Sequence, residues 1–175
     1  MKKKTKLIAF LWIISGLLTL SCEKMDDGEH VVPITLYEKV AGTWTLKDVL
    51  QIDETAKIAG IKPDEISLFN QFGFESFQIA LEVDNSDQPT SYKVSGNSPE
   101  LFPTEGFWEI NPSFPAANGT APTINLYSDA SKTTLVGQLE VVSMPGATTD
   151  MELKLTRSTA GVPFVSYHYK LSITQ

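Results

Sequence analysis

The chain has 175 residues, of which 42% are hydrophobic, and it carries 21 acidic and 14 basic side chains for a net charge of −7. This acidic balance argues against nucleic acid and anionic phospholipid as partners, because both attract lysine and arginine. The single cysteine excludes an intramolecular disulfide, so a folded domain must be stabilised by its core alone.

The first 21 residues have the features of a bacterial signal peptide. A basic start is followed by the apolar run Leu7–Leu20 and by the small residue Ser21. Cys22 comes next, where a lipoprotein carries its lipid-accepting thiol, so we predict a signal peptide over 1–21 and lipid attachment at Cys22. A cleaved signal without lipid is one alternative. A transmembrane helix is disfavoured because it needs about 20 apolar residues.

Removal of residues 1–21 would take away four lysines and no acids, so the net charge would fall from −7 to −11. We expect residues 22–34 to form an acidic flexible tether, since they include Glu23, Asp26, Asp27 and Glu29 and little to bury. Two or more acyl chains anchor stably, so we expect the membrane to be a permanent partner. The expected location is the outer membrane, on its periplasmic or its surface face.

Two short helices are predicted early in the chain. Thr35 and Glu38 fit a capping box, in which each side chain satisfies a backbone N–H group of the first turn, and Gly42 is a natural stop. Pro63 followed by Asp64 and Glu65 resembles the start of a second helix, over residues 64–69.

Strands are predicted over most of the remaining chain. Phe77, Ile79, Leu81 and Val83 alternate with polar residues, which is the period expected when only one face of a strand is buried. Similar runs predict eight strands, at residues 43–52, 75–83, 90–96, 106–110, 123–127, 134–143, 151–157 and 164–174.

Short turns join these segments, and none of the later connections has a helical pattern. This arrangement favours an antiparallel meander. Closing the meander removes exposed strand edges. We therefore predict a mainly β protein in which residues 35–175 form one domain, an eight-stranded antiparallel up-and-down barrel with one or two short helices. A barrel of this size can be filled by side chains or can hold one small ligand.

Gly42 and Trp44, at the start of the first strand after a short helix, resemble the Gly-x-Trp signature of the lipocalins. Together with the lipoprotein signal and residues 102–109, they make the chain similar to small lipocalin-like lipoproteins of unknown function from the Bacteroidota. The resemblance implies a lipocalin-like barrel, with Gly42 and Trp44 as a structural signature and Trp44 closing one end. It implies fold more strongly than activity.

Four aromatic residues are candidates for ligand binding. Phe69, Phe72 and Phe74 lie on a segment that would cross the mouth of a barrel, as a lid over a ligand or as additional core under a loop. Trp108 is either an aromatic wall for a ligand or a second core tryptophan.

No motif predicts catalysis, a metal or a cofactor. The two histidines, His30 in the tether and His168 in an alternating strand, are poorly placed for a Ser-His-Asp relay. We therefore expect a non-catalytic binding module for a small apolar ligand or a glycan, acting through a cavity or through the loops 99–103 and 112–122. The alternative is a protein-interaction or inhibitor subunit with a filled barrel.

Overall fold

The computed structural model describes residues 33–98, 100–146 and 149–174. Ile34–Gln175 form one compact unit, which is separate from the residues before it. The predicted signal peptide, Cys22 and nearly all of the predicted tether therefore lie outside the described residues. Among the residues described, no helix has the length and hydrophobicity needed to cross a membrane.

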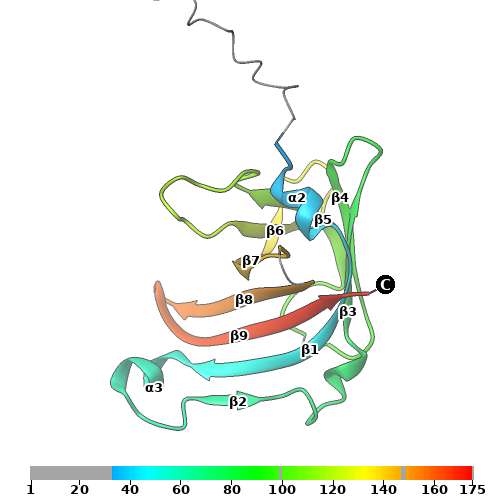
Figure 1. Cartoon of the computed structure of the whole chain (residues 1–175). Coiled ribbons are helices and arrows are strands. Elements are labelled where there is room, and N and C mark those ends of the chain that lie inside the picture. The colour runs from blue at the N-terminus through cyan, green and yellow to red at the C-terminus, as the bar shows by residue number, and fades with distance from the viewer. Residues whose placement is uncertain (1–32, 99, 147–148, 175) are drawn as a thin grey trace, which may run out of the picture. The chain divides into compact units, whose positions relative to one another are not determined.

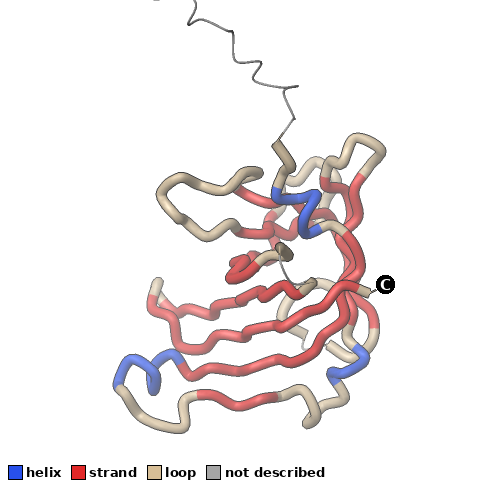
Figure 2. Tube along the Cα trace, in the orientation of Figure 1, coloured by secondary structure: helices blue, strands red, loops and turns tan. Residues whose placement is uncertain are grey.

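The described unit is almost entirely β-structure (Figures 1 and 2). It contains the α-helices α2 (Leu36–Val40) and α3 (Glu54–Ala59) and a 3-10 turn, η1 (Phe74–Ser76). The strands are β1 (Gly42–Asp53), β2 (Glu65–Ser67), β3 (Gln78–Val83), β4 (Pro89–Ser95), β5 (Glu105–Asn111), β6 (Thr123–Tyr127), β7 (Leu135–Ser143), β8 (Asp150–Thr159) and β9 (Val162–Ile173).

Eight of these strands form a closed antiparallel barrel, as predicted. From β3 to β9 each strand pairs with the next along the chain, and β9 pairs with β1, which closes the sheet. The short strand β2 is an addition to the barrel and pairs with β1 alone. The predicted up-and-down topology is confirmed.

Strand β1 is long enough to serve two neighbours along one edge. Its first residues, Gly42–Thr45, pair with β3, and its last, Leu50–Ile52, pair with β2. Its other edge pairs with β9 over most of its length, from Trp44 to Asp53. Figure 1 shows β2, β1, β9 and β8 running side by side in the lower part of the view.

The two ends of the barrel differ. At the α2 end, where β1 begins, Leu36 and Val40 are buried, and the Trp44 indole N–H donates to the Val40 carbonyl at 2.8 Å. Gly42, between Val40 and Trp44, has a φ of +123°, in the region that favours glycine. We call the opposite end, where β1 leads into α3, the α3 end.

The predicted first helix is confirmed, with Thr35 as its N-cap and Glu38 completing the capping box. The predicted second helix is wrong: the residues after Pro63 form β2, because the free edge of β1 accepts Glu65–Ser67 as a strand. The second helix is instead α3. Asp53 caps it by accepting from the Ala56 amide at 2.8 Å, and Gly60 ends it in the left-handed conformation.

The barrel interior holds one cluster of buried apolar side chains. Its largest fully buried members are Trp44, Trp108, Tyr92, Tyr169 and Phe77. Both tryptophans are 0% exposed, and each satisfies its indole N–H with a backbone carbonyl. Burying these rings supplies a large share of the apolar area that stabilises the fold.

Replacing Trp44 by alanine should lower the free energy of unfolding by about 3–5 kcal/mol, the usual cost of truncating a core aromatic residue. The measurement is urea unfolding at equilibrium. Phe72→Ala is the control, because Phe72 is 58% exposed, and it should change stability by no more than about 0.5 kcal/mol. An unchanged unfolding midpoint for Trp44→Ala would contradict the core assignment.

Candidate functional site

Three open hollows lie toward the α3 end of the barrel. They have volumes of about 420, 270 and 160 Å³ and lie over β4 and β5, between β7 and β8, and beside β1 and β2, respectively. Large exposed apolar side chains concentrate at the same end: seven of the eleven in the described unit, namely Ile58, Ile61, Ile66, Phe72, Leu135, Val162 and Phe164. Exposed apolar surface beside hollows is typical of interaction sites.

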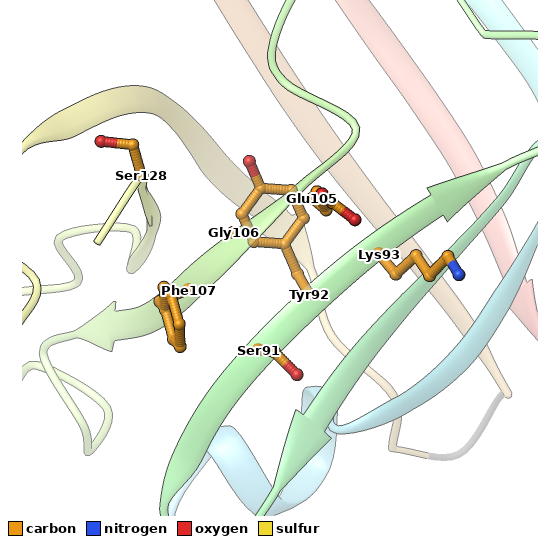
Figure 3. Close-up of a pocket in the computed structure, with 7 residues that line it drawn as sticks. All are labelled: Ser91, Tyr92, Lys93, Glu105, Gly106, Phe107 and Ser128. Carbon is orange, nitrogen blue, oxygen red and sulfur yellow. The ribbon is translucent and has the colours of Figure 1, made fainter. Parts of the chain in front are cut away.

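The largest of these three hollows takes its side chains from paired positions of β4 and β5 (Figure 3). Ser91 lies opposite Phe107 and Lys93 opposite Glu105 on these strands. Ser128, from the turn after β6, completes the lining. An aromatic ring, two hydroxyl groups and one charge of each sign can stack on and hydrogen-bond to a sugar or a peptide.

Gly106 allows the chain to approach closely at the floor of this hollow. A Cβ atom there would lie 2.3 Å from the Tyr127 carbonyl oxygen and 2.9 Å from Cε1 of Tyr92. The Tyr92 hydroxyl donates to the Pro103 carbonyl at 3.1 Å. Burial, with a smaller effect of the Glu105 carboxylate, raises the pKa of Tyr92. Its hydroxyl therefore stays protonated and keeps donating to the β4–β5 connection.

The second hollow lies where β7 and β8 separate. Leu101 and Leu155 line it together with β7 residues 135–138, and Arg157 stands at its edge. The Arg157 Nη2 donates to the Leu101 carbonyl at 3.3 Å. The adjacent Phe102 packs its ring 6.2 Å from that of Tyr169. The connection between β4 and β5 therefore fills this side of the barrel.

The Tyr169 hydroxyl is buried among these groups and has no hydrogen-bond partner in the described part of the chain. Its ring lies 5.9 Å from Phe77 and is 2% exposed. Burial raises the pKa of Tyr169 well above its usual value, with a smaller contribution from Tyr167. The group is therefore a neutral hydroxyl in an apolar setting.

The structure brings only some of the predicted ligand-binding residues together. Phe69 and Phe74 pack partly buried against the core, and the ring of Phe72, which is largely exposed, lies 5.4 Å from that of Phe74. All three lie on the connection from β2 to β3 at the α3 end. Trp108 is instead fully inside the barrel, where its indole N–H donates to the Glu82 carbonyl at 2.8 Å. No face of its ring is open to a ligand.

The two predicted recognition loops lie at opposite ends. Residues 112–122, between β5 and β6, lie at the α2 end, where the Ser113 carbonyl accepts from the Leu36 amide at 2.9 Å. Of the other loop, Pro99 lies outside the described residues, and residues 100–103 lie at the α3 end beside β7 and β8.

Sequence reasoning missed the outer cover of β9. Ser166 is fully buried although it lies on the outward face, because α3 packs against β9. Its hydroxyl donates to the Glu54 carboxylate of α3 at 2.5 Å. His168, on the same face, places Nδ1 2.8 Å from Glu152, and its Nε2 has no partner among the described residues. The signals that could have revealed α3 were the capping residue Asp53 and the terminating Gly60.

No hydrogen bond between His168 and a serine or threonine hydroxyl occurs in the described residues. No group of three or more His, Cys, Asp or Glu side chains is arranged there to hold a metal ion. The residues that line the hollows offer apolar contact, hydrogen bonds and single charges.

The fold and its hollows thus define a closed antiparallel β-barrel with open surfaces at one end. The chain belongs to the DUF5004 family, a domain of unknown function, whose model matches residues 21–172. No curated protein and no solved structure matches the chain. The expectation of a family without a known function is supported, while the Bacteroidota lipoprotein assignment stays a prediction.

Gly106→Ala should destabilise the protein by about 1–3 kcal/mol, because the added methyl group meets the Tyr127 backbone and cannot be accommodated without moving β5 from β6. Equilibrium unfolding in urea measures the change. Gly146→Ala is the matched control, because nothing lies within 4 Å of a Cβ atom at that position. Equal stability of the two variants would show that the close approach at Gly106 is not required.

Proposed function

We propose that this protein is a membrane-anchored, non-catalytic binding module that holds a partner protein at the α3 end of its barrel. The observation that carries the proposal is that, among the described residues, three hollows and most of the exposed apolar side chains lie toward that one end. Burying exposed apolar surface is the main driving force for protein association.

The filled interior supports recognition at the surface. Trp44, Trp108 and Tyr169 occupy the barrel with 2% exposure or less. The hollows formed by described residues open to solvent and mix polar with apolar lining, which suits an extended ligand better than an enclosed apolar molecule.

A glycan is the second candidate ligand. It is favoured by the hollow over β4 and β5, whose lining includes Phe107, Ser91, Ser128, Lys93 and Glu105. Sugars bind through stacking on an aromatic ring combined with hydrogen bonds to polar neighbours. A small apolar ligand has less support, because these hollows expose charged and hydroxyl groups.

Anchoring is proposed from the sequence. Cys22 follows a signal-like segment, and an acylated cysteine would hold the mature chain at the outer membrane. The described unit begins at Ile34, directly before α2. The anchor would therefore be joined to the described unit through the residues directly before α2.

Cys22→Ser should leave an unprocessed precursor that is not acylated, because serine cannot form the thioether that carries the lipid. Fractionation, metabolic labelling with a radioactive fatty acid and mass spectrometry of the intact chain measure the change. Membrane retention and labelling equal to those of the parent protein would contradict lipidation.

Replacing Phe72 and Phe164 together by serine should reduce partner capture by about tenfold or more, because it removes two apolar contacts at the α3 end. The measurement is cross-linking on intact cells, followed by mass spectrometry of peptides and glycans joined to the purified protein. The control replaces Ile34 and Phe114 by serine at the α2 end. Exposure is matched, at 58% and 45% for the test pair and 61% and 45% for the control pair.

Equal capture by the parent and both variants would contradict recognition at the α3 end. Joined glycan in place of peptide would favour the second candidate. Both variants should unfold at the same urea concentration as the parent to within about 0.5 kcal/mol, since exposed side chains are replaced.

A further inference from the structure

Strands β7 and β8 separate before either strand ends. Their ladder runs from Ser143 and Glu152 to a last pair, Glu140 with Lys154. Beyond that pair, β7 extends back to Leu135 and β8 continues to Thr159, each still paired with its other neighbour. We call the region between residues 135–139 and 155–159 the split.

The backbone groups that face the split follow from the ladders on either side. The Val141 amide donates to the Pro122 carbonyl, so the backbone N–H and C=O groups of residues 141, 139 and 137 point toward β6. Those of the alternate residue Gln138 therefore point toward β8. In the same way, the Ile173 amide donates to the Thr149 carbonyl, so the backbone polar groups of the odd-numbered residues 149 to 157 point toward β9. Those of Thr156 therefore point toward β7. Gln138 and Thr156 would form the next hydrogen-bonded pair of the ladder, and neither is paired across the split.

The chain itself holds these edges apart. The Leu101 carbonyl accepts from Arg157, and the Cβ atom of Phe102 lies 3.4 Å from where a side chain on Gly137 would begin. These contacts involve side chains or single carbonyls. No backbone hydrogen bond from residues 135–139 or 155–159 to the connection between β4 and β5 is found among the described residues.

Strand β1 also has a stretch that extends beyond its neighbour, but there another strand pairs with the free edge. Its last residues extend beyond β3, and β2 pairs with them at Leu50, Gln51 and Ile52. The split has no such strand in the described residues. Nor are its edges protected in the usual way by lysine or proline, since residues 135–138 are Leu, Val, Gly and Gln.

The charge at the split is also unmatched. Arg157 is exposed and lines the hollow, and none of the described carboxylates lies within ion-pair distance of it. An unpaired guanidinium group in an otherwise acidic protein favours a carboxylate on whatever binds there.

We propose that the split binds an extended peptide segment of the partner protein, which adds as a strand to the free edges and places an acidic residue beside Arg157. Backbone hydrogen bonds to Gln138 and Thr156 would supply affinity, and apolar side chains would enter the hollow lined by Leu101, Leu135 and Leu155. This proposal rests on the proposed function and adds that the partner is bound through an extended strand.

The test is a selection of displayed random ten-residue peptides on the parent protein. The best binder is then synthesised with its normal backbone and with alternate peptide nitrogens methylated, which removes backbone donors. Selected peptides should alternate in polarity and contain Asp or Glu. Methylation should weaken binding by at least about tenfold, the factor expected for the loss of one or two backbone hydrogen bonds.

Thr156→Pro is the decisive variant, because it removes the amide donor that faces the split while residues 155 and 157 keep their bonds to β9. Binding of the selected peptide should fall by at least about tenfold. Thr156→Val is the matched control and should bind as the parent does, since it keeps the amide. Arg157→Glu should change the selected residue from acidic to basic.

Amide hydrogen exchange provides a second readout. On addition of the peptide, exchange at Gln138 and Thr156 should slow, and exchange at Asn118 in the loop at the α2 end should not change. Melting temperatures of all variants establish that they are folded.

Failure to select any peptide, equal binding to Thr156→Pro and the parent, or unchanged exchange at Gln138 and Thr156 would each overturn the split as a peptide site. These outcomes would leave the proposed function standing if the Phe72 and Phe164 variant still lost its partner. Unchanged capture by that variant would contradict recognition by the exposed aromatic residues of the α3 end. The Thr156 variants would then still show whether the split binds a peptide.

Discussion

The long pairing of β1 with β9 is the interaction on which the rest of the structure depends. It closes the barrel, and it extends from Trp44 to Asp53, well past the four residues of β1 that pair with β3. Strands β8 and β9 are long as well, whereas β3 to β6 are short. The excess length all appears at the α3 end. One end of the barrel is therefore sealed by α2 and Trp44, while the other has strand edges that need partners.

Most of the strands were predictable because they have one buried and one wet face, whereas β6 is buried on both faces and is a short apolar run. All eight predicted barrel strands occur within three residues of their expected bounds at each end, and β6 matches fully. The capping box at Thr35 and Glu38 was equally local. The helix predicted after Pro63 failed because its signals were weak compared with the backbone hydrogen bonds available on the free edge of β1.

The candidate site was much less predictable. Alternation shows which side chains face inward but not where a ladder stops, so nothing in residues 135–139 or 155–159 indicates the split. For Trp108 the sequence left a ligand wall and a second core tryptophan open, because its burial depends on closure of the barrel, where its indole N–H donates to Glu82 of β3. Arg157 belongs to no sequence motif. It is a candidate for binding because none of the described carboxylates lies within ion-pair distance of it. Such properties arise from tertiary pairing and from charge balance in space.

The N-terminal connection reaches the described unit at one of its two ends. The described unit is entered at Ile34 beside α2, and β1 carries the chain from there to the α3 end over 12 residues, or about 40 Å of extended strand. A lipid on Cys22, as proposed above, would be joined to the described unit through the residues that precede α2, at the sealed end. The free strand edges lie at the other end of the described unit, away from this connection, where their backbone groups could pair with an added strand.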